Sequence, residues 1–146
     1  MTTTLKPEPP ASGVAPLTHP RRWCFTLEQY YRLGELGILG DKHTELIGGD
    51  IYMVPIGPEH SFGKQTSRRY LERKLRKGVH LRIEDPLRIG DNEPVPDLAV
   101  VSGKPSDYCK QHPTTALLAI EVADTTLEFD YTVKASLYAS ATIPEY

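Results

Sequence analysis

The stretch Ala116-Leu-Leu-Ala-Ile-Glu-Val-Ala123 is an apolar run interrupted near its end by a single acid, Glu121. Its length and its branched residues predict a β-strand that is covered on both faces. An ionised carboxylate in such a place costs roughly several kcal/mol unless a cation or hydrogen-bond donors meet it. Upstream, Pro96-Asp-Leu-Ala-Val-Val101 places a second acid, Asp97, at the start of a second apolar strand. Two acids carried by two neighbouring strands suggest a metal site.

Length and composition predict one globular domain. A chain of 146 residues is large enough to bury one core but hardly two. Its 39% apolar and 25% charged residues are typical of a soluble globular protein. Residues 1–20 are rich in proline and threonine and offer little to a core, so we expect a flexible tail there and a single domain over residues 21–146.

The chain shows no sign of membrane association or disulfide chemistry. No apolar stretch approaches the ~20 residues needed to span a bilayer, and the first residues lack the basic-then-apolar pattern of a secretory signal. We therefore expect a cytoplasmic protein. Cys24 and Cys109 form no CxxC pair and have no histidine cluster at zinc-like spacing, so we expect free thiols that are buried or half-buried.

The net charge of −2 excludes a uniformly basic nucleic-acid-binding domain. Any nucleic-acid contact must come from a local patch. One candidate, called the basic run below, holds six cations within ten residues: Arg68, Arg69, Arg73, Lys74, Arg76 and Lys77. A solvated helix face is the alternative explanation of such a run.

The first half of the chain predicts a helix, a hairpin and a second helix. Thr26 and Gln29 fit a capping box, so a short helix should begin at Leu27. The pair Gly48-Gly49 between short apolar segments predicts a tight hairpin. Residues 58–77 are polar with sparse apolar anchors, which predicts a long, half-exposed helix with the basic run on its second half.

The second half predicts strands followed by one helix. Residues 79–83 and 87–89 alternate as strands do, and residues 102–115 are expected to form a polar loop between the Asp97 and Glu121 strands. Asp130 can cap a final helix over residues 131–140, with Val133, Leu137 and Tyr138 facing the sheet. Central strands with flanking helices indicate an α/β protein of α+β-like order, built on a mixed sheet.

The two acids fit the coordination chemistry of a hard divalent cation. Mg²⁺ or Mn²⁺ takes one or two carboxylates from a protein and leaves other positions for water and phosphate oxygens. Such an ion lowers the pKa of bound water and neutralises charge on a phosphate, as phosphodiester hydrolysis requires. Lys134, on the helix after the Glu121 strand, is the candidate for orienting that water or holding the oxyanion.

Simpler explanations exist for each of these residues. Glu121 could form a buried ion pair with Lys134 or with an arginine. Asp97 could belong to a Pro-Asp turn that opens a strand. Glu45, before the hairpin, could lie at the surface, and His60 could be a residue of a helix start.

A set of ordered motifs nevertheless resembles the Uma-two family of proposed restriction endonucleases, within the PD-(D/E)XK nuclease superfamily. The resemblance runs from about Arg22 to Tyr146. It rests on Glu45-Leu46-Ile47-x-Gly49-x-Ile51, Pro55-x-Gly57-x-x-His60, Pro96-Asp97-Leu98, Glu121-Val122-x-Asp124-Thr125-Thr126-Leu127, Asp130, Lys134, Tyr138-Ala139 and Ile143-Pro144-Glu145-Tyr146.

The resemblance implies a fold and a set of roles. The superfamily core is a mixed four-stranded sheet with helices on both sides. Asp97 and Glu121 correspond to the metal-binding acids, and Glu45 is similar to an upstream acid that touches the metal directly or through water. Ala123 stands where the superfamily pattern has lysine, and Lys134 is the lysine expected to replace it. The resemblance gives no role to His60.

One departure leaves two hypotheses open. In the family the Pro-Glu-Tyr segment continues into a further apolar strand, whereas this sequence stops at Tyr146. We expect that missing strand to leave a sheet edge unpaired, which makes a homodimer plausible. The first hypothesis is a Mg²⁺-dependent DNA endonuclease. The second is a shortened, catalytically impaired module that binds nucleic acid or a protein partner.

Overall fold

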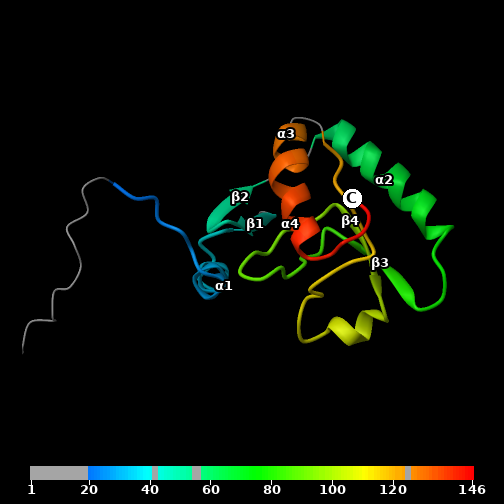
Figure 1. Cartoon of the computed structure of the whole chain (residues 1–146), viewed down its shortest axis with the longest axis horizontal. Coiled ribbons are helices and arrows are strands. Elements are labelled where there is room, and N and C mark those ends of the chain that lie inside the picture. The colour runs from blue at the N-terminus through cyan, green and yellow to red at the C-terminus, as the bar shows by residue number, and fades with distance from the viewer. Residues whose placement is uncertain (1–19, 41–42, 54–56, 124–125) are drawn as a thin grey trace, which may run out of the picture.

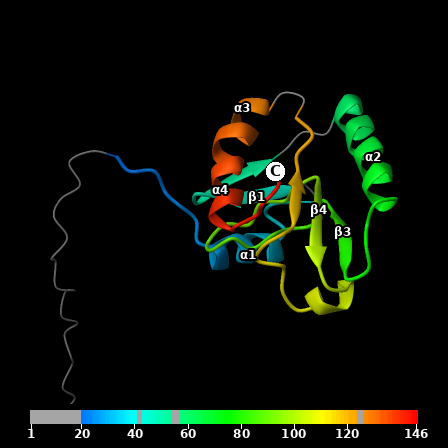
Figure 2. The same cartoon turned by 45° about the vertical axis from the view of Figure 1, so that its right-hand side comes forward.

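The computed structural model describes residues 20–40, 43–53, 57–123 and 126–146. The expected N-terminal tail lies outside these residues except for Pro20. Figure 1 colours the described elements along the chain, from blue at the N-terminus to red at the C-terminus. Figure 2 shows the three-stranded sheet between the last helices and α2.

The first helix forms where its capping box predicts it. α1 (Leu27–Glu35) begins after Thr26, whose side chain accepts a hydrogen bond from the Gln29 N–H. The Gln29 side chain in turn accepts one from the Thr26 N–H. These reciprocal bonds satisfy two N–H groups that a helix start leaves without partners. The apolar face of α1 packs through Tyr30 against Leu46 of the following hairpin.

The paired glycines form the predicted hairpin. β1 (Thr44–Ile47) and β2 (Asp50–Met53) pair antiparallel, and the φ angles of Gly48 and Gly49 between them are 61° and 81°. A tight hairpin turn of this kind needs positive φ at both central residues. Position 49 requires glycine for a second reason, because a Cβ there would lie 2.5 Å from the Cys24 Cβ. Cys24 and Cys109 are free thiols but are exposed, so their expected burial was wrong.

Three further strands form a second antiparallel sheet. β3 (Val79–Ile83) pairs with β4 (Leu98–Ser102), which pairs with β5 (Leu118–Ile120). The strand predicted over residues 116–123 was therefore too long at both ends. The expected burial on both faces was also wrong for Leu117, which is exposed.

Two other segments differ from the prediction. Residues 87–89 form no strand, because Ile89 folds back onto Asn92 through an isolated bridge across a turn at Gly90. The predicted loop over residues 102–115 contains a 3₁₀ helix, η1 (Pro105–Tyr108).

The helices and strands confirm the α/β class with its α+β-like order. In place of one mixed sheet, the described residues form two antiparallel sheets, β1-β2 and β3-β4-β5. Backbone hydrogen bonds between Leu46 and Glu93 link the hairpin to the segment that leads into β4. The link brings β1 close to the start of β4, where the acid Asp97 lies.

The main core lies between the three-stranded sheet and the last helix. Tyr138, fully buried, enters this core from α4. Its members are Leu87, Ile89, Ala99, Val101, Ala116, Ala119, Tyr138 and Ile143. The core thus fixes the sheet against the helix that carries Lys134.

The last helix starts earlier than predicted. α3 (Leu127–Phe129), a π-helical turn η2 (Asp130–Lys134) and α4 (Ala135–Ser140) follow one another without a break. Asp130 therefore lies inside the helical segment and does not cap it. Val133, expected to face the sheet, is exposed, so that assignment was wrong.

α2 (Pro58–Glu72) ends five residues before the predicted Lys77 and buries only one residue, His60. The basic run is divided as a result. Arg68 and Arg69 lie in the helix, Arg73 is its C-cap, and the other three cations follow it. None of the described helices is long and apolar enough to cross a membrane.

α2 approaches the segment just after β5 at a glycine, and Gly63→Ala should therefore destabilise the protein. A Cβ on Gly63 would lie 2.7 Å from Val122 Cγ1. Overpacking of this kind costs about 1 to 3 kcal/mol, more than the helix propensity gained from alanine. We expect a lower melting temperature by thermal denaturation. Gly34→Ala in α1, where a Cβ meets nothing within 4 Å, is the matched control and should be neutral or stabilising. Equal behaviour of the two variants would contradict the close approach of α2.

Candidate active site

Three acids lie in one row across the end of the three-stranded sheet. In the β4–β5 register Leu98 opposes Ile120, so one further step places Asp97 opposite Glu121. In the β3–β4 register Ile83 opposes Leu98, so the same step places Glu84 opposite Asp97. Directly opposite strand residues project to the same face of a sheet, which applies to Asp97 and Glu121. Glu84 has left the strand conformation, with a φ of 51°, but its N–H still bonds to the Asp97 carbonyl. The antiparallel pairing, which the sequence did not predict, thus gathers the acids.

These acids line a small cavity. Its volume is about 30 Å³, which is enough for a water-sized ligand. Its charged and titratable lining comes from both sheets and from two helical segments: His43, Glu45, His60, Glu84, Asp97, Glu121, Asp130 and Lys134. The cavity therefore contains all four residues expected from the sequence to carry the chemistry.

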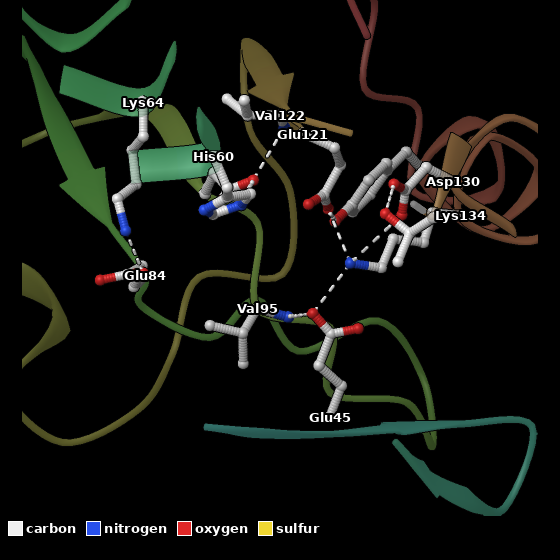
Figure 3. Close-up of polar contacts among 12 residues, drawn as sticks. Glu45, His60, Lys64, Glu84, Val95, Glu121, Val122, Asp130 and Lys134 are labelled. Atoms are coloured by element: carbon white, nitrogen blue, oxygen red, sulfur yellow. Dashed lines mark hydrogen bonds and ion pairs between the residues drawn. The ribbon is translucent and has the colours of Figure 1, made fainter. Parts of the chain in front are cut away.

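Lys134 connects three of the carboxylates (Figure 3). Its Nζ lies 2.9 Å from Glu45 Oε1, 3.1 Å from Glu121 Oε1 and 3.8 Å from Asp130 Oδ1. The Lys134 side chain is only 3% exposed. The proposed Glu121–Lys134 ion pair is thus present, but it is one part of a larger network.

The π-helical turn presents both Asp130 and Lys134 to this network. The Ala135 N–H donates to the Asp130 carbonyl, the i to i+5 bond of a π-helix. The Tyr146 hydroxyl donates to the same carbonyl at 2.7 Å, and the Thr126 hydroxyl donates to Asp130 Oδ2 at 2.6 Å. The wide turn and its carboxylate are therefore held from three sides.

Burial raises the pKa of both glutamates in this network. Burial raises the pKa of Glu121 to about 8, even though the Lys134 ammonium opposes the rise. Burial also raises the pKa of Glu45 against the same opposing charge. Burial alone would lower the pKa of Lys134, but Glu121 and Glu45 raise it above its ordinary value. Lys134 therefore stays protonated, and its single positive charge is too small to offset the burial of several carboxyl groups.

Glu121 also accepts a hydrogen bond from the core. The Tyr138 hydroxyl lies 2.5 Å from Glu121 Oε1, and burial raises the pKa of Tyr138 so that it stays a donor. Glu121 lies one residue beyond β5, where the strand ends and its side chain turns toward Lys134. The acid that interrupts the apolar run is therefore met by a cation and a hydroxyl.

Asp97 is held separately from Lys134. His60 Nε2 lies 2.9 Å from Asp97 Oδ1 and 3.0 Å from Oδ2, and the Val122 N–H donates to Oδ2 at 2.7 Å. Because carboxylate oxygens accept, His60 Nε2 carries the proton in this arrangement. His60, for which no role was predicted, is thus the residue that orients Asp97.

The donor set fits a cation in chemistry. Its oxygens are hard ligands, and two buried atoms, Glu45 Oε2 and His60 Nδ1, have no hydrogen-bond partner among the described residues. Within the same part of the chain, however, no three histidine, cysteine, aspartate or glutamate side chains are arranged to hold an ion. The positive charge among the carboxylates is instead the Lys134 ammonium.

Sequence reasoning missed Asp130 and Glu84 as cavity residues. Asp130 had a signal, since it precedes Lys134 by four residues and such pairs share a helix face. Glu84 had none, because its position depends on an unusual φ of 51° at the end of β3.

The basic run lies outside the cavity. Arg68 is paired with Glu72 at 2.7 Å, and Lys74 lies over the Tyr70 ring, 5.8 Å from its centroid. All six cations are exposed. They form a charged surface on and after α2, as both explanations of the run require.

Comparison with known proteins identifies the family. The Uma2 model, described as "Putative restriction endonuclease", matches residues 27–146. A 1.96 Å crystal structure of a "putative nuclease belonging to DUF820" from Anabaena variabilis ATCC 29413 has a TM-score of 0.55 and 18% identity, covering 75% of this chain and 66% of that one. This chain thus spans just under two thirds of that protein, and the likeness confirms the nuclease fold alone. No curated protein matches. Since the family model covers most of the sequence, the chain belongs to the Uma2 family of restriction-endonuclease-like proteins.

Proposed function

We propose that the chain is a DNA endonuclease that hydrolyses phosphodiester bonds with Mg²⁺ or Mn²⁺. The observation that carries the proposal is the placement of Asp97 opposite Glu121, with Lys134 Nζ 3.1 Å from Glu121 Oε1. Family membership supports a nuclease-like activity. The metal, the DNA substrate and the roles of the residues are our proposals.

Each residue has a role that follows from its contacts. Asp97 and Glu121 would hold the ion, which when bound lowers the pKa of water and neutralises phosphate charge. Lys134 orients the attacking water or holds the developing oxyanion, because its ammonium is buried beside Glu45 and Glu121. Glu45 supports Lys134 through its 2.9 Å contact and keeps a free oxygen for a water or a second ion.

Removal of one acid should abolish cleavage. We expect Glu121→Gln or Asp97→Asn to lower the rate of plasmid cleavage in Mg²⁺ or Mn²⁺ by at least about a hundredfold, because an electrostatic contact to the reacting groups is lost. Glu59→Gln, an exposed glutamate of α2, is the control and should cleave normally. Circular dichroism would verify that all variants fold. Cleavage that survives in Glu121→Gln, or in EDTA, would contradict the proposed chemistry.

The basic run is the proposed DNA-binding surface. Each phosphate contact contributes about one unit to the slope of log Kd against log salt. The double variant Arg69→Ala, Arg73→Ala should therefore weaken duplex binding and reduce that slope by roughly two. Fluorescence anisotropy over a salt series measures both. Arg32→Ala in α1, whose side chain is paired with Glu35, is the control. An unchanged slope would identify the run as a solvated face only.

One observation favours the second candidate, a non-catalytic binding module. The Lys134 ammonium already lies among the carboxylates, and no three donors converge among the described residues. Titration with Mn²⁺ separates the candidates, since a ligand that binds only the folded state raises its melting temperature. No shift at millimolar Mn²⁺, with wild type and Glu121→Gln alike, would favour the module.

A further inference from the structure

Lys64 and Glu84 form a second charge pair beside the cavity. Lys64 lies one helical turn after His60, on the face of α2 that meets the sheet. Its Nζ contacts Glu84 Oε1 while His60 contacts Asp97, so two neighbouring links join α2 to adjacent positions of the acid row (Figure 3). Neither residue of this pair takes part in the chemistry proposed for Asp97, Glu121, Lys134 and Glu45.

Glu84 is the most exposed carboxylate of the cavity lining, which also includes the exposed His43. The Glu84 side chain is 26% exposed, against 10% or less for the other described carboxylates of the lining. Solvent therefore reaches the acid row at Glu84. Lys64, at 13%, is the ammonium beside that opening, whereas Lys134 lies deeper and is engaged by three acids.

The backbone of Glu84 is held in an unfavourable conformation. Its φ of 51° lies in the left-handed region, which a residue with a side chain seldom adopts. Its N–H nevertheless donates to the Asp97 carbonyl at 3.1 Å, so the strained residue is fixed to the acid it accompanies. Strained residues cluster at functional sites, where surrounding structure holds them.

We propose that Lys64 is a substrate-binding residue that contacts a phosphate of the nucleic acid at the cavity mouth, and that Glu84 holds its ammonium there in the free protein. This inference rests on the proposed nuclease function. A phosphate that enters past Glu84 meets Lys64, whose side chain is 13% exposed, before it meets Lys134 at 3%. Phosphate and the Glu84 carboxylate are both anions, so they compete for one ammonium.

Competition predicts effects of opposite sign. Lys64→Met removes a phosphate contact, so DNA affinity should fall on the order of tenfold and the salt slope by about one. Glu84→Gln keeps the shape but releases the ammonium, so affinity should rise several-fold. A merely structural ion pair would give losses of the same sign, because either change would disturb the same local packing.

The experiment measures binding of a labelled DNA duplex by fluorescence anisotropy in EDTA, so that no cleavage takes place. Lys64→Arg retains the charge and should restore binding. Arg32→Gln and Glu35→Gln, which break an exposed ion pair of α1, are matched controls and should change nothing. In steady-state cleavage, Lys64→Met should raise KM more than it lowers kcat. Melting temperatures show which variants fold, and Glu84→Asn, which tolerates positive φ, replaces Glu84→Gln if needed.

The outcomes separate this inference from the proposed function. Weaker binding by Lys64→Met together with tighter binding by Glu84→Gln supports it. If DNA binds but both variants shift affinity in the same direction, or neither shifts it, the inference is overturned and the nuclease proposal stands. If wild type and Glu84→Gln bind no duplex at low salt, both the inference and the proposed substrate are overturned.

Discussion

Replacement of Lys134 with methionine should destabilise the folded protein by about 3 to 5 kcal/mol at neutral pH, because it removes the cation from a buried network. The ammonium contacts Glu45 and Glu121 within 3.1 Å and Asp130 at 3.8 Å, and every one of these side chains is buried. Methionine fills a similar volume, so the loss reports charge and not packing. Urea denaturation measures it.

Two comparisons sharpen this result. Lys110→Met, at an exposed lysine, should change stability by no more than about 0.5 kcal/mol. Millimolar Mn²⁺ should restore part of the stability of Lys134→Met, because the remaining carboxylates need a cation. A loss below about 1 kcal/mol for Lys134→Met would mean that the ammonium does not hold the network together.

The stability of the metal-free protein should fall as pH rises through neutrality. Burial raises the pKa of Glu121 from about 4.5 to about 8. Between these values the folded state binds a proton that the unfolded state has lost, so its contribution to stability is full below about pH 4.5 and is lost as pH rises through 8. At about 1.4 kcal/mol for each unit, the loss is on the order of 3 to 5 kcal/mol.

Glu121→Gln provides the control for this pH dependence. Glutamine has no proton to lose yet still accepts hydrogen bonds from Tyr138 and Lys134. The stability of Glu121→Gln, followed by urea denaturation in EDTA, should be nearly independent of pH across the same range. Any dependence that remains comes from the other titrating groups, which both proteins share. Wild-type stability that rises from pH 6 to pH 9 relative to Glu121→Gln would contradict the raised pKa.

Local signals in the sequence predicted most of the elements. The Thr26 capping box and the Gly48-Gly49 turn are formed by residues within a few positions of one another, so α1 and the hairpin were correct. Element ends depend on partners far along the chain. β5 stops at Ile120 because it pairs with only three residues of β4, and α2 ends at Glu72 although polar sequence continues.

The candidate site was partly predictable for a similar reason. Glu121 was detectable as a carboxylate in an apolar run, and Lys134 was expected near it on the next helix. The link between His60 and Asp97 joins residues 37 apart, and the Glu84 position follows from one backbone angle. Neither leaves a periodic pattern in the sequence, since both arise from tertiary packing.

The most direct test of the central claim is a crystal structure of the protein soaked in Mn²⁺, with anomalous data collected near the manganese edge. The account predicts one anomalous peak within bonding distance of carboxylate oxygens of Asp97 and Glu121, with the Lys134 ammonium moved away from Glu121, and no such peak in Glu121→Gln. A peak elsewhere, or none at saturating Mn²⁺ with Lys134 still seated between Glu45 and Glu121, would contradict the assignment of these acids as the metal ligands of a nuclease.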